Sequence, residues 1–162
     1  MEIEELIERY GDDILRLCLM ILGERQLAED AFQETFVKAW KQRHTFRGES
    51  SEKTLLIRIA INCCRDYRRS AWYRYIDFRV SLDQLPILSS APPSDDHIAL
   101  TMAIMKLKPK YMEVVLLYFY EGYLIKEIAK MLNLTEAAVS SRIHKAKQRL
   151  RAELEGGEDD EK

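Results

Sequence analysis

The chain has 162 residues and a formal net charge of -2 at pH 7, which fits one ordinary domain or two small ones. It has three cysteines, two of them adjacent (Cys63 and Cys64), which excludes a disulfide-stapled secreted domain and a CxxC metal site. The longest apolar runs, LCLMIL and VVLLYFY, fall far short of the ~20 residues that span a bilayer, and no signal peptide precedes the first predicted helix, so we expect a cytoplasmic protein without direct membrane insertion.

Charge is unevenly distributed along the first half of the chain. Residues 1–37 contain 3 basic and 10 acidic residues, whereas residues 38–79 contain 11 basic and 4 acidic residues. This pattern predicts two different surfaces, one for a protein partner and one for nucleic acid. Residues 156–162 form an acidic tail that we expect to be frayed.

Two amphipathic helices are predicted at the start of the chain. Apolar residues repeat at helical spacing from Ile3 to Ile21, with Gly11 as an irregularity and Gly23 as the stop. A second helix is predicted over residues 27–40. Its apolar face is predicted to carry Leu27, Ala31, Phe32, Phe36, Val37 and Trp40. Its polar face is predicted to carry Asp30, Gln33, Glu34, Lys38 and Lys41.

A third helix and a basic, aromatic segment follow. After a loop over residues 44–50, Ser51 can cap a helix that runs to about Arg69 and is apolar on one side. Its other side is basic, with Arg58, Arg65, Arg68 and Arg69. The next residues, 72–79, mix Trp and Tyr with Arg, which suits stacking on unpaired bases, although aromatic residues near a helix end more often belong to a core.

The segment SLDQLPILSSAPPS, residues 81–94, is rich in proline and serine and has no regular period. We predict that it is a flexible linker between a domain over residues 1–80 and one over residues 95–155. Ser94 can cap a helix that runs to about Lys106. Pro109 fits the first turn of another helix, which is predicted to reach Tyr120 and to be ended by Gly122.

The segment IKEIAKMLNLTEAAVSSRIHKAKQRL, residues 125–150, predicts a helix-turn-helix. Asn133 tolerates the left-handed backbone angles that end a helix, and Thr135 can cap the next one, which leaves a turn of roughly three to four residues. An inward stripe is predicted from Ala138, Val139, Ile143, Ala146 and Leu150. The outward residues are predicted to be Ser140, Ser141, Arg142, His144, Lys145, Lys147, Gln148, Arg149 and Arg151. Hydroxyl groups can read base edges and cations can hold phosphates, whereas an ordinary helical hairpin with a solvated basic face is the alternative.

No strand pattern persists anywhere, so we predict an all-α fold of two small helical domains, the second with the helix-turn-helix. The sequence has no phosphate-binding glycine loop, no His or Cys metal spacing and no nucleophile elbow. His44, His97 and His144 are scattered singly. We therefore expect no enzyme activity, no metal and no cofactor.

Three segments in this order resemble the extracytoplasmic-function type of bacterial RNA polymerase sigma factor, over nearly the whole chain. LAEDAFQETFVKAW, residues 27–40, is similar to the polymerase-binding segment of that family. FRGESSEKTLLIRIAINCCRDYRR, residues 46–69, is similar to the segment that opens and reads the downstream promoter box. Residues 107–151 are similar to the domain that reads the upstream box. The resemblance implies a specificity subunit of RNA polymerase that directs promoter-specific initiation in a stress or envelope response.

The resemblance also implies roles for single residues. Core polymerase would be bound by Asp30, Gln33, Glu34, Phe36 and Lys38. An extruded base of the melted promoter would be held by the loop 46–53, including Phe46, Arg47 and Ser50, together with Asn62. The backbone of the melted strand would be held by Arg65, Arg68 and Arg69. The double-stranded upstream box would be read by Ser140, Ser141, His144 and Lys145, with phosphates held by Arg142, Arg149 and Arg151. A separate anti-sigma factor is the implied inhibitor.

The chain departs from the family pattern at a few positions, and two other functions are alternatives to this resemblance. Thr54 stands where Trp is frequent, Asn133 where Gly is usual, and Ala138 and Ser140 where Thr or Gly and a basic residue are frequent, so the upstream sequence that is read does not follow from the resemblance. A stand-alone helix-turn-helix regulator would bind an operator as a dimer without polymerase, but the N-terminal half has no sustained heptad seam. A purely structural helical adaptor would show no salt-dependent DNA affinity.

Overall fold

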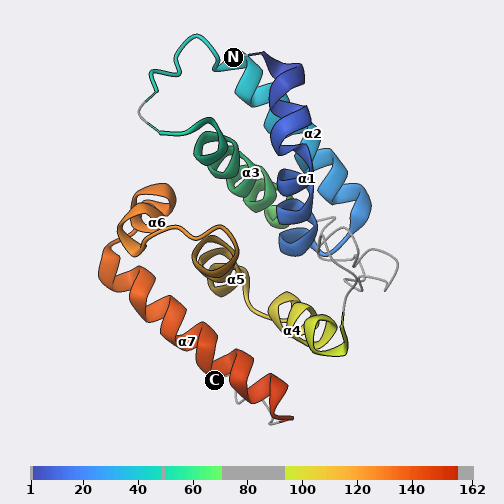
Figure 1. Ribbon diagram of the computed structural model, residues 1–162, viewed down its shortest axis with the longest axis vertical. Coiled ribbons are helices and arrows are strands. Elements are labelled where there is room, and N and C mark those ends of the chain that lie inside the picture. The colour runs from blue at the N-terminus through green and yellow to red at the C-terminus, as the bar shows by residue number, and fades with distance from the viewer. Residues whose placement is uncertain (1, 49, 71–93, 157–162) are drawn as a thin grey trace. The chain divides into compact units, whose positions relative to one another are not determined.

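The computed structural model of the protein describes residues 2–48, 50–70 and 94–156. Every regular element among them is a helix (Figure 1), which confirms the predicted all-α fold. The chain divides into two compact units, Met1–Ser90 and Ala91–Lys162. The predicted aromatic and basic segment at 72–79, the linker apart from Ser94 and the tail beyond Gly156 lie outside the described residues.

The first unit contains three helices: α1 (Ile3–Leu22), α2 (Arg25–Lys41) and α3 (Glu52–Arg69). Gly23 ends α1 with φ 71°, a left-handed angle that glycine adopts without strain, and this confirms the predicted stop. The Glu24 carboxylate caps α2 by accepting hydrogen bonds from two backbone N–H groups of its first turn. Ser51 Oγ accepts from Thr54 N at 3.0 Å and so caps α3, as predicted.

Each of these three helices packs against the other two around an apolar core. The largest fully buried side chains of this core are Ile14, Leu19, Leu22, Leu27, Leu56, Ile57 and Ile61. The expected irregularity at Gly11 is absent, because α1 continues through it without a break. Gly11 is itself buried, with the Phe32 ring of α2 close to the place where a side chain would begin.

The second unit contains α4 (Asp95–Met105), α5 (Pro109–Val115), the π-helix η3 (Leu116–Tyr120), α6 (Ile125–Leu132) and α7 (Glu136–Leu154). Ser94 caps α4 and Pro109 opens α5, both as predicted. The prediction of one regular helix from Pro109 to Tyr120 is wrong in its last five residues, which are wound as a π-helix. Gly122, with φ 74°, follows directly. An apolar run carries no signal for this wider winding, which depends on how its side chains pack.

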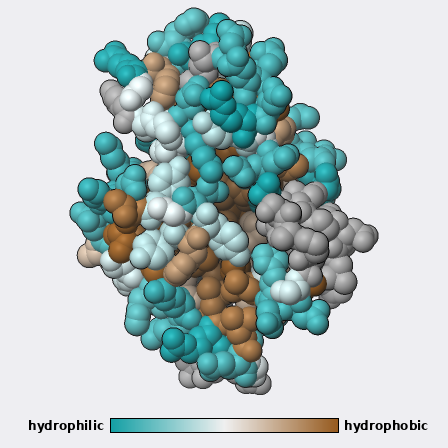
Figure 2. Space-filling view, viewed as in Figure 1, coloured by the Kyte–Doolittle hydropathy of each residue, from teal (hydrophilic) through white to brown (hydrophobic). Residues whose placement is uncertain are grey.

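The core of the second unit lies between α7 and the other helices. Its largest fully buried residues are Ile104, Leu117, Ile128, Val114 and Val115. Val139, Ile143 and Ala146 face this core from α7, as predicted, whereas Ala138 and Leu150 lie at the edge of the stripe and are half-buried. Figure 2 shows hydrophobic side chains gathered between α4 and α7, the helices that carry the exposed Met102 and Leu154.

Candidate functional site

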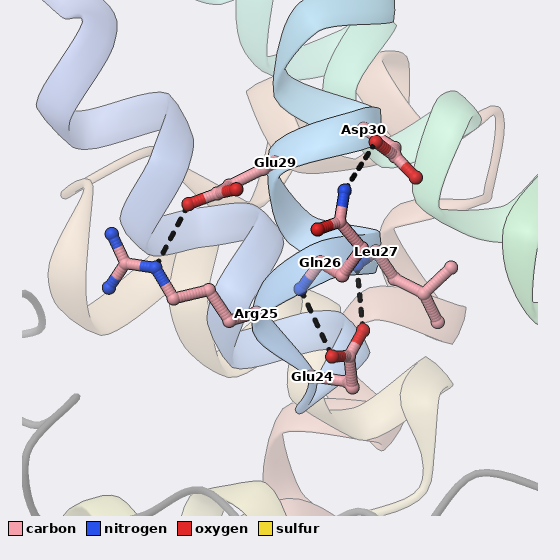
Figure 3. Close-up of polar contacts among 6 residues, drawn as sticks. All are labelled: Glu24, Arg25, Gln26, Leu27, Glu29 and Asp30. Carbon is pink, nitrogen blue, oxygen red and sulfur yellow. Dashed lines mark hydrogen bonds and ion pairs between the residues drawn. The ribbon is translucent and has the colours of Figure 1, made fainter.

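One face of α2 presents two carboxylates and an amide. Asp30, Gln33 and Glu34 fall within little more than one helical turn, so they share a side of the helix. Gln33 is exposed and the two acids are half-buried. Asp30 Oδ1 accepts a hydrogen bond from Gln26 Nε2 at 3.1 Å (Figure 3), which orients this carboxylate from the preceding turn. We call Asp30, Gln33 and Glu34 the α2 polar face.

Lys38 lies beside the α2 polar face and is already paired. Its Nζ is 3.4 Å from Glu34 and 4.0 Å from Asp66 of α3. The Coulomb interaction with the ionised form of Cys63, followed by Glu34 and Asp66, raises the pKa of Lys38. Two carboxylates of the same unit already pair with the Lys38 ammonium. Lys38 therefore helps to orient the α2 polar face, and its charge is only partly available to a partner.

Two residues of α3 extend this face, and the sequence did not predict them. Burial raises the pKa of Tyr67, and the nearby Glu34 and Asp30 carboxylates raise it further, so the phenol stays protonated and donates a hydrogen bond to Glu34. Asp66 is exposed next to it. The sequence gives no signal that an acidic residue and a tyrosine near the end of α3 belong to the α2 polar face, because only the packing of the helices brings α3 next to α2.

The apolar side of α2 differs from its prediction at two positions, Val37 and Trp40. Phe36 is only 4% exposed and its ring packs against Phe32, with centroids 5.0 Å apart, so it lies in the core, as its place on the apolar face predicted, and its polymerase contact stays a prediction. Val37 and Trp40, predicted to be core, are 50% and 47% exposed. The Arg43 guanidinium lies 3.7 Å from the centre of the Trp40 ring. Gln33, Val37 and Trp40 are spaced by four and three residues along α2. This helical spacing was the sequence signal that the three residues share one exposed face.

A second face, on α3, carries a basic stripe. Arg58, Asn62, Arg65 and Arg69 are spaced by four, three and four residues, which places them on one side of the helix over about 16 Å. Arg65 is half-exposed and the other three are exposed. Arg58 was not among the predicted DNA-binding residues, yet it extends the stripe by one turn. We call these four residues the α3 basic stripe.

Arg68 does not lie on the α3 basic stripe. It lies between Arg65 and Arg69 in sequence but on another side of the helix, and its Nη1 atom is buried. Arg69 is exposed and pairs with Asp66 at 3.3 Å. The structure therefore separates Arg68 from the two arginines with which the sequence grouped it.

The loop before α3 contains the other residues predicted to hold a melted base. Phe46 and Ser50 are half-exposed and Arg47 is exposed. Gly48 has φ 73°, an angle that bends this loop and favours glycine. Asn62 lies three turns along α3 from the loop, and within the part of the chain that the structure describes no hydrogen bond joins it to Phe46 or Arg47.

The helix-turn-helix in the second unit forms as predicted. Asn133 has φ 56° and ψ 49°, and Leu134 N donates to Ala129 O at 2.8 Å, which closes the end of α6. Thr135 Oγ1 accepts from Ala138 N at 3.0 Å and caps α7. Along the first half of α7 the exposed residues are Ser140, Ser141, His144 and Lys145, and Arg142 is half-exposed.

Cations in the second half of α7 lie against aromatic rings of the same unit. The Arg149 guanidinium is 4.7 Å from the ring centre of Tyr111, a side chain that is 4% exposed. Lys147 Nζ is 5.4 Å from the Phe119 ring. Arg149 therefore has a packing contact on α5, and the phosphate contact predicted for it stays a prediction.

Other kinds of site find little support among the described residues. They contain no group of three or more His, Cys, Asp or Glu that could hold a metal ion. Cys18, Cys63 and Cys64 are buried free thiols, and burial raises the pKa of Cys63. None of the helices that the structure describes is long and apolar enough to cross a membrane.

Comparisons with known proteins match each unit separately. The family model for Sigma-70 region 2 matches residues 6–74, and the one for Sigma-70, region 4 matches residues 97–150. The chain is 32% identical to the ECF RNA polymerase sigma factor SigM of Bacillus subtilis (strain 168), over 99% of this chain and 100% of that protein. It is 29% identical to the sigma factor SigW of the same organism, over 93% and 87% of the two chains.

Solved structures of similar fold include two protein complexes. One is the sigma factor RpoE in complex with the anti-sigma factor NepR from Bartonella quintana, with a TM-score of 0.72 and 21% identity over 94% of this chain and 95% of that one. The other is CnrH in complex with the cytosolic domain of CnrY, with a TM-score of 0.67 and 26% identity over 96% and 89% of the two chains.

Proposed function

The chain belongs to the ECF family of RNA polymerase sigma factors, and from this premise we propose how its residues divide the work. It is a sigma factor that directs transcription initiation, so the stand-alone regulator is not favoured. We take it to act in the cytoplasm, on promoters of a stress or envelope response, as a regulatory subunit without catalytic activity of its own.

The α2 polar face docks on the largest subunit of core polymerase in this proposal. Two carboxylates and an amide on one helix side suit a basic partner surface, and hydrogen bonds from Gln26 and Tyr67 hold both acids in place before binding. Preorganised side chains lose less conformational entropy when a complex forms. Val37 and Trp40 add exposed apolar area on the same side of α2.

The α3 basic stripe and the loop before it hold melted DNA of the downstream box. Cations on one side of a helix can contact successive phosphates of one DNA strand. In duplex DNA the phosphates of a strand are spaced by roughly 3.4 Å along the axis. A base inside the stack is out of reach of a pocket, and unstacking costs a few kcal/mol per step against roughly 1–3 kcal/mol gained per stacked base. Melting therefore needs both the stripe and the help of polymerase.

The first half of α7 reads the upstream box as a duplex. In a helix-turn-helix the start of the second helix enters the major groove, and here that start presents two serines, a histidine and a lysine. Ser140, Ser141 and His144 can hydrogen-bond to base edges, and Lys145, which was predicted to do the same, is a cation that can also reach a phosphate, as Arg142 can.

An anti-sigma factor is the proposed inhibitor. RpoE of Bartonella quintana was solved with the anti-sigma factor NepR, and CnrH with the cytosolic domain of CnrY. We propose that a comparable protein covers the polymerase-binding and DNA-binding faces of this chain. Affinity capture of the tagged protein from unstressed cells should bring down one stoichiometric inhibitor of core binding.

One observation supports the whole assignment: a single chain carries an acidic polar face on α2 in one unit and a helix-turn-helix whose second helix exposes polar and basic residues in the other. The test is run-off transcription with core polymerase on fragmented genomic DNA from the source organism. The variant Asp30→Ala, Gln33→Ala, Glu34→Ala should lose the specific transcripts that the wild type gives, because the docking contacts are removed while the helix-turn-helix is intact.

Glu29→Ala is the matched control for this experiment. Glu29 is a half-buried acid one turn before Gln33 that pairs with Arg25 at 2.9 Å (Figure 3) and is not one of the three residues that define the α2 polar face. It should transcribe like the wild type. The proposal fails if the triple variant still directs the same transcripts, or if the protein binds DNA specifically and regulates it without core polymerase.

A further inference from the structure

Two ion pairs join α1 to the first turn of α3. Lys53 Nζ lies 3.3 Å from Asp13 Oδ2, and Arg9 Nη1 lies 3.9 Å from Glu52 Oε1. Asp13 is steadied on its own helix by Arg16 Nη1 at 3.5 Å. These pairs join residues about forty positions apart in sequence, so they report on how α3 is set against α1.

The order of the charges along α1 and α3 fixes how the two helices lie against each other. Along α1 the cation Arg9 precedes the anion Asp13, and along α3 the anion Glu52 precedes the cation Lys53. A shift of α3 that set Glu52 beside Asp13 would oppose two carboxylates. The Asp13 and Lys53 side chains are 35% and 33% exposed, so solvent screens this pair less than a fully exposed one.

The place where the pairs attach is the end of the loop assigned to base capture. That loop is anchored at its start by Arg43 Nη1, which donates to Trp40 O at 2.7 Å, and by Thr45 N, which donates to Gln42 O at 2.9 Å. Its end is anchored at Ser51, whose hydroxyl donates to Thr54 Oγ1 at 2.9 Å while it also caps α3. Any movement of the first turn of α3 therefore moves the loop.

We propose that Asp13 and Lys53 are positioning residues that hold Phe46, Arg47 and Ser50, before α3, in the geometry needed to capture an unpaired promoter base. This inference rests on the proposed function of the loop. The alternative role for Lys53, a cation at the start of a DNA-binding helix, is a direct contact with a phosphate. The two roles differ in what they require of Asp13, which as an anion would not contact a phosphate.

The experiment measures base capture by the reconstituted holoenzyme. A promoter found in the run-off assay is prepared as a fork with 2-aminopurine at each position of the downstream box in turn, and the fluorescence rise on unstacking is titrated. Asp13→Asn and Lys53→Gln should each weaken capture about two- to fivefold, the range expected for one partly exposed ion pair. Affinity for core polymerase should not change.

A double-mutant cycle separates positioning from phosphate contact. If the pair acts as a unit, the double variant Asp13→Asn, Lys53→Gln should be no worse than either single variant. Asp12→Asn is the matched control, since Asp12 is an exposed neighbour with no ion pair to any residue that the structure describes. Capture that is unchanged or improved in Asp13→Asn, with a loss in Lys53→Gln, would assign Lys53 to phosphate and overturn the proposal.

The variant Phe46→Ala tests the proposed role of the loop in base capture separately from the inference about Asp13 and Lys53. If Phe46→Ala weakens capture and Asp13→Asn does not, the positioning pair is refuted and the loop keeps its role. If Phe46→Ala leaves capture unchanged, the loop does not hold the base, and both the assignment and the inference built on it are wrong.

Discussion

Cations of the recognition helix α7 differ in what they touch. Lys145 is exposed, whereas Arg149 lies over the buried Tyr111 ring of α5. A side chain that packs inside its own unit contributes to the free energy of unfolding, and one that faces solvent is free to replace counterions on DNA. Residues of the same charge on one helix therefore have separable roles.

Substitution of each cation should give opposite results. Arg149→Ala should lower the unfolding free energy of the second unit by about 1 kcal/mol, because a cation–π contact is lost, and should change the salt dependence little. Lys145→Ala should leave stability within about 0.5 kcal/mol and reduce the slope of log affinity against log salt by about 0.9. Thermal denaturation and titrations of upstream-box DNA by holoenzyme at several salt concentrations measure both. The reverse pattern would assign Arg149 to phosphate.

At the scale of elements, the caps and turns of the helix-turn-helix are set by single residues. Asn133 has the only positive φ among the non-glycine residues that the structure describes. An L-residue at this angle brings its Cβ close to the following carbonyl oxygen, and asparagine tolerates this better than most residues. The turn between α6 and α7, and hence the direction of the recognition helix, depends on this position.

Changes at Asn133 should follow this backbone requirement. Asn133→Ala should destabilise the second unit by about 1 kcal/mol, whereas Asn133→Gly should be neutral or stabilising, since glycine adopts left-handed angles without strain. Chemical denaturation followed by circular dichroism gives both values. Equal losses in the two variants would instead point to the asparagine side chain as the source of stability.

At the scale of the whole molecule, the two units have separate cores. Leu56 is fully buried in the first and Ile128 in the second. In our proposal the first unit binds polymerase and melted DNA and the second reads duplex DNA, so a chain of two units divides these contacts between two compact bodies. Stability should therefore also be divided between the units.

Core truncations test this division. Ile128→Ala should destabilise the second unit by about 2–5 kcal/mol and speed amide exchange in α5, α6 and α7, with α1 to α3 unchanged. Leu56→Ala is the matched variant and should do the reverse. Hydrogen exchange followed by mass spectrometry assigns the effect to each helix. Faster exchange in both units from either change would show that they unfold together.

The sequence by itself determined most of the helices, several of their caps and the family. Gly23, Ser51, Ser94, Thr135 and Asn133 act within a few residues of their own position, so their effect can be read locally. The helix-turn-helix followed from the same local signals. The order of the three motif segments then indicated the sigma factors, and the comparisons confirmed this.

Only the tertiary structure decided which side chains are available. Phe36 is in the core while Val37 and Trp40 are exposed, and Arg68 has a guanidinium nitrogen buried, because the position of the neighbouring helices fixes which part of each surface is covered. The same holds for Tyr67 beside Glu34 and for Lys53 beside Asp13. These partners lie more than thirty residues apart, and periodicity gives the faces of one helix but not the identity or register of the helix that packs against it.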